Sequence, residues 1–324
     1  MIDLKKMPKV ELHVHLDGSL NPKSVASVLS IDEKEALDKM VAKEKCIDLN
    51  DYLTKFSLPV SAMQTEKNLI ELSREFVKEL EKDNVIYAEV RFAPLKHISN
   101  LSLEQVIESV LEGLKCSSIK INLILCMMRN DPFEENKKVI ELALKYKNKG
   151  VVAVDLAGAE SLYKTYNFKE LFEIAKLNKL PFTIHAGEAD GVSSIESALN
   201  FNTKRIGHGV RSVEDDKILE KIKNDKILLE ICPTSNVQTN VVDKLENHPI
   251  RKLYDYGCQV CINTDNRTVS NVSLTDEYEN LIKSLNFSII DLINMNKMAL
   301  NNSFLDDKEK QKMLSKIDEY TKSL

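Results

Sequence analysis

Eight short strand-like runs alternate with longer helical patterns along this chain of 324 residues. In the helical patterns, apolar residues recur at positions i, i+3, i+4 and i+7, and charged residues occupy the opposite face. Strands that alternate with helices indicate a parallel sheet, and eight such units predict closure into an α/β fold of the (β/α)8 TIM barrel type. An open doubly wound sheet is the alternative, but no G-x-G-x-x-G follows the first run. The runs cover residues 9–15, 85–93, 120–129, 151–158, 182–188, 205–210, 227–235 and 259–266.

Two regions depart from this repeating pattern. Residues 18–84, after the first strand, hold several short helical patterns where one crossover helix would suffice. An insertion after a barrel strand lies over the carboxyl-end face, where barrel active sites lie, so we interpret these residues as a lid, with a plain helical elaboration as the alternative. Residues 287–324, at the C-terminus, carry two more helical patterns, which we expect to pack outside the barrel. Because no linker-like or low-complexity stretch separates these regions, residues 1–324 are predicted to form a single domain.

The composition excludes several classes of protein. The formal net charge of −5 at pH 7 argues against nonspecific binding to nucleic acid. No stretch approaches the ~18 consecutive apolar residues of a membrane span, and the amino-terminal residues lack the apolar core of a signal peptide. Six scattered cysteines are typical of reduced thiols. We therefore expect a cytoplasmic protein that acts without nucleic acid or membrane, and the oligomeric state is left open.

The first strand-like run carries two histidines one residue apart. Because side chains alternate along a strand, His13 and His15 point to one side, and Val10, Leu12 and Val14 point to the other. In a barrel the apolar set should face the helices, and the histidines should face the lumen near its carboxyl-end mouth. Two imidazoles this close form half of a metal site, although a pair of hydrogen-bonded histidines is the simpler interpretation.

Further polar residues end the later strands. His185 ends the fifth strand, Glu188 lies in the turn that follows, His208 ends the sixth strand and Asp265 ends the eighth. Four of the six histidines and two carboxylates are thus predicted to meet at one mouth. Histidine and aspartate ligands with room for water fit a catalytic Zn²⁺ or a similar divalent ion.

The remaining histidines and one cysteine pair receive simpler interpretations. We expect His97 and His248 to be solvated or helix-capping residues, because both lie in loop or helix-start contexts. The stretch CQVC holds Cys258 and Cys261, whose thiols would face opposite sides of a strand. A packing role for these cysteines is therefore expected, rather than half of a zinc site.

Charged residues within the strands form another group. Glu11, Glu89, Arg91 and Glu230 alternate onto the presumed lumen side, and we expect them to form an interior hydrogen-bonded network deeper than the strand tips. The patterns G-x-S-x-G and G-x-x-x-x-G-K-[ST] are absent, which argues against a nucleophile elbow and a phosphate-binding P-loop.

Six motifs, taken together, resemble the adenosine deaminase family, a group of metal-dependent purine nucleoside deaminases in the amidohydrolase superfamily. They are PKVELHVHLDGSL, DLAGAE, HAGE, RIGHGV, ICPTSN and INTDN, and they span residues 8–266. The resemblance implies one Zn²⁺ per chain, held by His13, His15, His185 and Asp265. It implies Glu188, His208 and Asp265 as the catalytic residues, with Glu188 protonating purine N1 and His208 orienting or deprotonating the attacking water.

The resemblance also implies a substrate-binding set, composed of His15, Asp17, Gly158 and Asn266. Asp17 is expected at the ribose hydroxyl and Gly158 at purine N3, and Leu53 and Phe56 of the early insertion are expected to line the pocket. This chain departs from the family at NTDN, where Asn266 replaces a second aspartate that contacts N7. Because N7 is an acceptor, an amide NH₂ can donate to it in any protonation state, so the change is compatible with purine binding.

The expected reaction is the hydrolytic deamination of adenosine, and of 2′-deoxyadenosine, to inosine and ammonia in purine salvage. A related purine deaminase that accepts adenine or methylthioadenosine is the first alternative. A barrel that kept its metal site only to bind metal or purine is an alternative of a different class. Deamination of a flipped nucleic-acid base is disfavoured, since the H-x-E…P-C-x-x-C signature is missing. The expected partner is therefore a small purine nucleoside.

Overall fold

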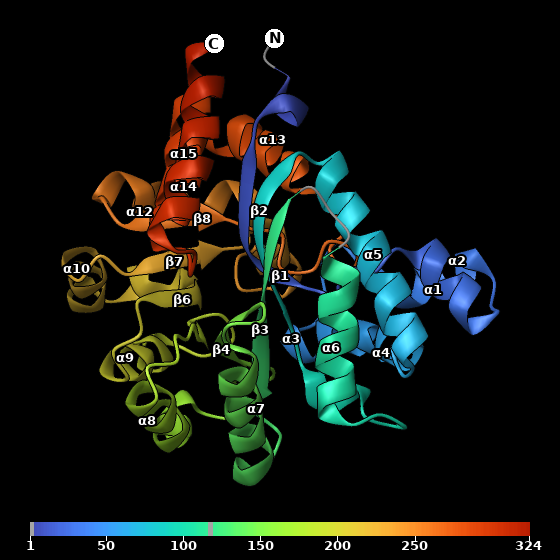
Figure 1. The fold of residues 1–324 in the computed structure, drawn as a ribbon. Helices are drawn as coiled ribbons and strands as arrows, with labels where there is room; N and C mark the ends of the chain where they lie inside the picture. Colours follow the sequence, from blue (N-terminus) through green and yellow to red (C-terminus); the bar gives the residue numbers. More distant parts are fainter. Residues whose placement is uncertain (1–2, 116–118) are drawn as a thin grey trace.

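Eight parallel strands form the centre of the molecule (Figure 1). The computed structural model describes residues 3–115 and 119–324. Within them the strands form two four-stranded sheets, with orders β1-β2-β3-β4 and β5-β6-β7-β8. The strands are β1 (Lys9–His15), β2 (Val85–Phe92), β3 (Lys120–Met128), β4 (Val151–Ala157), β5 (His185–Ala186), β6 (Arg205–His208), β7 (Leu228–Ile231) and β8 (Gln259–Ile262).

The two sheets meet along both of their edges. A parallel bridge joins Val154 of β4 to Phe182 just before β5, and another joins Val14 of β1 to Asp265 just after β8. At the second seam the backbone N–H of His15 donates to the carbonyl of Asp265 at 2.7 Å. The eight strands therefore enclose a common lumen, and the predicted (β/α)8 barrel is confirmed.

Several strands are shorter than the sequence pattern predicted, and the expected strand 259–266 pairs regularly only over Gln259–Ile262. The expected strand 182–188 retains regular pairing only over β5, because the chain turns sharply at Gly187, where φ is +72°. The expected strand 227–235 ends at Ile231, because Pro233 begins helix α11. Proline has no backbone N–H for a sheet but is well suited to the first turn of a helix.

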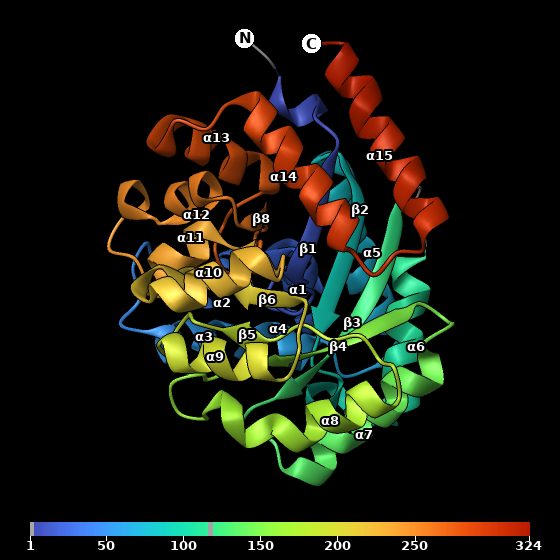
Figure 2. The ribbon, with the colours of Figure 1, turned by 90° about the vertical axis from the view of Figure 1, so that its left-hand side faces the viewer.

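Helices connect the strands and cover the outside of the barrel (Figure 2). Most of them present an apolar stripe to the sheet, as the i, i+3, i+4 spacing predicted, whereas the short α11 buries mainly polar side chains. The connecting helices are α5 (Glu66–Lys82), α6 (Leu103–Leu114), α7 (Phe133–Tyr146), α8 (Lys169–Leu177), α9 (Val192–Asn200), α10 (Asp216–Asn224), α11 (Pro233–Gln238) and α12 (Ile250–Tyr256). None of the helices in the described ranges has the length and apolarity needed to cross a membrane.

The two regions outside the repeat are helical. The early insertion contributes α1 (Pro22–Leu29), α2 (Glu33–Met40), α3 (Leu49–Leu53) and α4 (Ser57–Ala62) before the crossover helix α5. The carboxyl-terminal region follows α13 (Leu274–Leu285) and consists of α14 (Ile289–Asn302) and α15 (Asp307–Lys322). Helix α14 packs against the outside of β1 and β8, as expected for helices outside the barrel. Both chain ends lie at the same end of the barrel (Figure 1).

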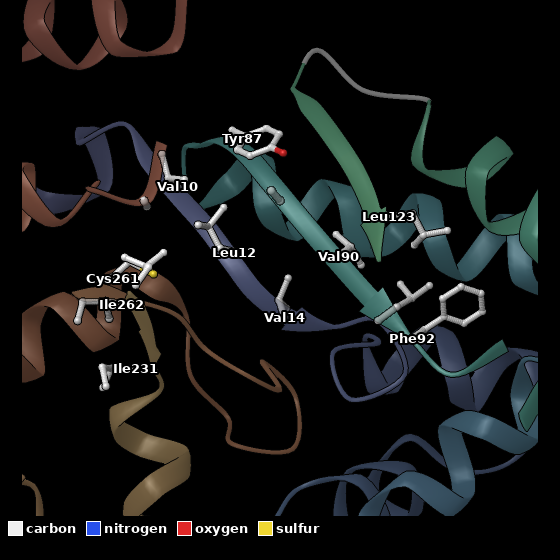
Figure 3. Close-up of a cluster of buried hydrophobic side chains, with 14 of the residues drawn as sticks. Val10, Leu12, Val14, Tyr87, Val90, Phe92, Leu123, Ile231, Cys261 and Ile262 are labelled. Atoms are coloured by element: carbon white, nitrogen blue, oxygen red, sulfur yellow. The ribbon is translucent and has the colours of Figure 1, made fainter. Parts of the chain in front are cut away.

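The main apolar core lies between the strands and the surrounding helices. Val10, Leu12 and Val14 of β1 are at most 1% exposed and belong to this core, so the predicted division of the strand into two faces is correct. Figure 3 shows them beside Val90 and Phe92 of β2. Burying a side chain of this size contributes about 1.5–3 kcal/mol each to stability.

The lumen below the mouth holds a network of buried charges. Arg205 pairs with Glu89 and, at 2.7 Å, with Glu230, while Arg91 pairs with Glu230 at 2.8 Å and Asp155 at 3.0 Å. All five side chains are at most 1% exposed. The predicted interior network is therefore confirmed for three of its four residues.

The fourth residue of the predicted network, Glu11, has other partners. Its carboxylate pairs with Arg267 at 2.9 Å and accepts from Thr264, and Arg267 also reaches Asp83 at 2.7 Å. Glu11 is buried, as predicted, but it belongs to a separate ion-pair cluster.

The interpretation of two histidines as solvated is wrong. His97 is fully buried against the ring of Phe92, and His248 is only 3% exposed. His248 does have the predicted capping contact, since its Nδ1 accepts from the backbone N–H of Ile250 at the start of α12. Loop position suggested exposure, but both loops fold back onto the barrel. Cys258 and Cys261 are buried in the apolar core, as the packing interpretation predicted.

Candidate active site and metal centre

A cavity of about 450 Å³ opens at the carboxyl ends of the strands. The barrel supplies its polar floor, and the insertion supplies an apolar wall from α3, α4 and the turn between them. Leu53 and Phe56 lie in that wall, as predicted, together with Tyr52 and Val60. The polar residues of the floor are His15, Asp17, His185, Glu188, His208, Asp265 and Asn266.

The four predicted metal ligands converge beneath this cavity. Nε2 of His15 lies 3.2 Å from Nε2 of His185 and 3.4 Å from Oδ1 of Asp265. Nε2 of His13 lies 3.3 Å from the same Asp265 oxygen. The alternation along β1 places His13 and His15 in the lumen, and barrel closure brings strands β5 and β8 to meet them.

A second layer of buried residues orients these ligands. His13 Nδ1 lies 3.0 Å from Glu230, and His185 Nδ1 lies 2.9 Å from Asp155. These contacts at Nδ1 leave each Nε2 facing the cluster, as is usual for histidine ligands of metals. Sequence reasoning assigned no such role to Glu230, and none to Asp155 of the DLAG motif.

The donor atoms of this cluster suit a cation. Within the described part of the chain, Nε2 of His13 and Nε2 of His208 have no hydrogen-bond partner although both are buried. Burial lowers the pKa of His15 to about 3, so its imidazole is neutral and able to coordinate. Burial opposes ionisation of Asp265, but the surrounding histidines hold its pKa below the usual range. The cluster therefore fits a divalent metal.

His208 belongs to the same cluster. One ligand atom from each of His13, His185, His208 and Asp265 can be chosen so that all lie within 4.8 Å of one another. His208 and Asp265 both adopt a left-handed backbone, with φ of +63° and +60°. Such conformations cost about 1–3 kcal/mol in residues other than glycine, and they concentrate at functional sites.

Glu188 lies beside this cluster with its carboxyl group buried. Oε2 lies 3.5 Å from Nε2 of His208, and Oε1 accepts from the Thr239 hydroxyl at 3.1 Å. Burial raises the pKa of Glu188 well above its usual value, and the nearby carboxylates of Asp265 and Glu160 act in the same direction. A protonated carboxyl of this kind can donate a proton to a bound ligand.

The imidazole ring of His208, beside Glu188, is held in its neutral form. Its Nδ1 lies 3.1 Å from the Asn236 side chain, while its Nε2 faces Glu188. Burial lowers the pKa of His208 well below its usual value, and His13 acts in the same direction, so the ring is neutral. Because the Asn236 amide donates to Nδ1, the single ring proton lies on Nε2, where it can donate to a bound ligand. Thr239 and Asn236 received no role from the sequence, although ICPTSN, which holds Asn236, was among the motifs.

The predicted substrate contacts line the cavity at a short distance from the ligand cluster. Asp17 is 5% exposed, and its Oδ2 lies 3.8 Å from Nε2 of the buried His97. Gly158 follows β4 at the cavity wall, and Asn266 lies against Gly18, where a Cβ would come within 1.9 Å of the Asn266 amide oxygen. The structure thus brings every predicted site residue to one face of the barrel.

Barrels with a histidine and aspartate ligand cluster at the strand ends include the metal-dependent amidohydrolases, and the fold and site place this chain in that class. The family model for adenosine deaminase matches residues 8–320, and the chain belongs to this family. An adenosine deaminase of Clostridium acetobutylicum is 39% identical over 326 residues, which cover 96% of this chain and 97% of that protein.

Two solved structures resemble the whole chain. An adenine deaminase from Arthrobacter aurescens has a TM-score of 0.87 at 26% identity, covering 98% of this chain and 99% of that one. An N6-methyl-AMP deaminase from Arabidopsis thaliana has a TM-score of 0.89 at 27% identity, covering 99% of each chain. The barrel and its helical insertion are thus shared with enzymes named for different adenine compounds.

Proposed function

We propose that this enzyme hydrolyses adenosine and 2′-deoxyadenosine to inosine and ammonia with one bound Zn²⁺. The observation that carries the proposal is the position of Glu188, a buried carboxyl with a raised pKa in the same cavity as the ligand cluster. Full-length similarity to a protein named adenosine deaminase supports the choice of substrate.

The donor set supports zinc as the metal. Histidine nitrogens and one carboxylate oxygen, with room left for water, are typical of catalytic zinc sites. The proposed ligands are His13, His15, His185 and Asp265. When bound, such an ion lowers the pKa of water towards ~7 and so supplies a nucleophile near neutral pH.

Glu188 and His208 act on the two reacting groups. As the water oxygen bonds to C6 of the purine, Glu188 donates its proton to N1, which allows C6 to become tetrahedral. His208 would orient the water through the proton on its Nε2. The water gives one of its protons to solvent and the other to the amino group, the C6–N6 bond breaks and ammonia leaves, and Glu188 is protonated again from solvent.

Other residues hold the nucleoside in place. Asp17 would accept a hydrogen bond from a ribose hydroxyl. The backbone N–H of Gly158 would donate a hydrogen bond to N3, and the Asn266 amide would donate one to N7. His15 is placed by its position in the floor to contact the substrate as well as the metal. The apolar wall from α3 and α4 would cover the purine, so the insertion would serve as the expected lid.

The charge of the cavity favours a nucleoside over a nucleotide. Among the described residues that line it, Lys96 is the one lysine or arginine. Its Nζ lies 2.6 Å from Oδ1 of Asp131, so its charge is already neutralised.

Buried free thiols at the described cysteines, Cys46, Cys126, Cys232, Cys258 and Cys261, support a reducing compartment, the cytoplasm.

One absorbance assay tests the proposal. Adenosine, 2′-deoxyadenosine, adenine, methylthioadenosine and AMP are compared side by side, before and after chelation and after Zn²⁺ is restored. We expect adenosine and its deoxy form to react fastest, with activity lost on chelation and recovered with zinc. Faster turnover of adenine would favour the related purine deaminase, and tight purine binding by metal-loaded protein without turnover would favour a non-catalytic barrel.

A further inference from the structure

Glu160 lies just beyond β4, and an unusually large number of hydrogen-bond donors surround its buried carboxylate. It is 1% exposed, and its carboxylate accepts from four consecutive backbone N–H groups in the loop after β5. These groups belong to Gly187, Glu188, Ala189 and Asp190, at 2.6, 3.0, 2.7 and 3.0 Å. The hydroxyl of Ser194 in α9 donates to the same carboxylate.

Four successive N–H groups that point at one carboxylate fix the course of the loop. Each buried N–H must find an acceptor, and bonds to an ionised acceptor are about twice as strong as neutral ones. Gly187 permits the required turn, since its φ is +72° and a Cβ there would come within 2.4 Å of Ile195. The segment that carries Glu188 is thus wrapped around the side chain of Glu160.

The contacts of Glu160 continue back to a metal ligand. The Ser194 hydroxyl lies 2.6 Å from that of Thr165, which accepts from Arg129 at 3.0 Å. Arg129 also donates to the backbone carbonyl of His185 at 2.6 Å. One buried network therefore holds both ends of residues 185–190, the segment that joins the proposed ligand to the proposed acid.

We propose that Glu160 is a positioning residue for Glu188, holding the 187–190 backbone so that the Glu188 carboxyl meets purine N1. The inference rests on the proposed function, since it assigns Glu160 a part in deamination. Glu160 touches neither the cluster of ligands nor the cavity, so it acts on Glu188 through the loop that it holds and through its nearby charge. Its removal should slow the chemical step without weakening the contacts that hold purine and ribose.

Glu160→Gln tests the proposal. A glutamine offers one acceptor oxygen and turns an NH₂ group towards donors, so the loop should lose its fixed course. Misplacement of a reacting group by about 1 Å can cost roughly 10²-fold in rate, so we expect kcat to fall by about that factor. KM for adenosine and the zinc content should stay within about twofold of wild type.

A double-mutant cycle separates positioning from general destabilisation. In a Glu188→Gln background the acid is already absent, so Glu160→Gln should reduce kcat by less than about twofold further. Equal losses in the two backgrounds would overturn the inference, because they would mean that Glu160 does not act through Glu188.

A matched control is Asp83→Asn. Asp83 is another buried carboxylate that accepts from two backbone N–H groups, those of Leu274 and Thr275, and from the Thr275 hydroxyl. It lies next to β2 at the amino ends of the strands, away from the cavity. This variant should lower the melting temperature while keeping kcat within about twofold of wild type. If it lowered kcat as much as Glu160→Gln does, the positioning role would be refuted.

Two further measurements keep the test decisive. If Glu160→Gln does not fold, Ser194→Ala carries the test, with an expected five- to tenfold loss of kcat; an unchanged kcat there would count against the proposal. Amide hydrogen exchange at 187–190 should accelerate at least tenfold in either variant relative to the rest of the barrel, and unchanged exchange would overturn the inference. Amide exchange can be measured whether or not the protein turns over adenosine. If the wild-type protein fails to deaminate adenosine, that result therefore refutes the proposed function, while the exchange data still test whether Glu160 holds the loop.

Discussion

The interior of the barrel and its mouth both bury charged and polar side chains, but they satisfy them differently. In the interior, Arg91 and Arg205 are each paired with two carboxylates. At the mouth, and within the described residues, buried atoms such as Nε2 of His13 and Oδ1 of Asp17 have no partner. Buried polar groups are normally hydrogen-bonded. In the interior the unpartnered atoms of the described residues, Nε of Arg91 and Oδ1 of Asp155, belong to side chains that are already ion-paired, whereas Oδ1 of Asp17 and Nε2 of His208 lie at the cavity, where a ligand can reach them. Substitutions in the interior should therefore change stability, and substitutions at the mouth should change turnover.

The largest expected effect is at the mouth, in Glu188→Gln. The amide keeps the shape of the side chain but cannot donate a proton as an acid. We expect kcat to fall by about 10³-fold, equivalent to about 4 kcal/mol in the barrier. Zinc content and inosine affinity, measured by metal analysis and calorimetry, should not change. Near-normal turnover would show that Glu188 is not the acid. It would also contradict the expectation that substitutions at the mouth, unlike those in the interior, change turnover.

The next largest effect is expected in the interior, in Arg205→Met. The change leaves Glu89 and Glu230 without a cation that both now contact, and removal of one partner from a buried pair costs roughly 3–5 kcal/mol. Denaturant unfolding measures this loss. Arg251→Met is the control. Both arginines pair with a carboxylate and lie over a phenylalanine ring, but Arg251 is partly exposed. This variant should cost less than about 1 kcal/mol. Similar losses of stability in the two variants would mean that burial inside the barrel does not increase the cost of removing an arginine from its ion pairs.

A third, smaller effect concerns a buried carboxyl that belongs to neither region. Glu277 has no ion pair among the described residues, and burial raises its pKa to about 8. Between about pH 4.5 and 8 the folded state keeps a proton that the unfolded state releases, so the free energy of unfolding falls as pH rises. Glu277→Gln lacks this loss and should be more stable than wild type by a few kcal/mol at pH 8.5, with little difference near pH 4.5. Melting temperatures across pH check this; a constant difference would mean that Glu277 does not titrate in this range.

The smallest effect is expected for Asn266→Asp at the mouth. An amide NH₂ donates to purine N7 at any pH, whereas a carboxyl donates only when protonated. The KM of the variant for adenosine should therefore rise with pH by about threefold relative to wild type, while its zinc content stays the same. Identical pH profiles of KM would contradict a contact between residue 266 and N7.

Much of the fold could be predicted because its signals are local. The apolar spacing of the helical patterns gave the helices around the barrel, and alternation along residues 9–15 correctly separated the core face from the face that carries His13 and His15. Strand ends were less predictable. The expected seventh strand was carried past Pro233 to residue 235, although a proline there favours the start of a helix, as α11 shows.

The candidate site was predicted in its residue types but not in its support. His13, His15, His185 and Asp265 follow from strand ends and motifs. Glu160, by contrast, is an acidic residue in a loop, and nothing in its own neighbourhood indicates that it accepts bonds from residues 187–190. The error at His97 has the same origin, since a loop residue is exposed or buried according to how the loop packs on the barrel.

The sequence by itself determined the number of βα units, the division of β1 into two faces, and the supply of side chains at strand ends that are able to bind a metal. These depend on spacing of a few residues, which backbone geometry converts directly into direction. Only the tertiary structure decided which partners orient those side chains. The contacts of His13 with Glu230 and of His185 with Asp155 join positions far apart in the chain. The first exists because closure of the barrel brings β7 close to β1, and the second because β4 and β5 lie side by side; no local periodicity encodes either contact.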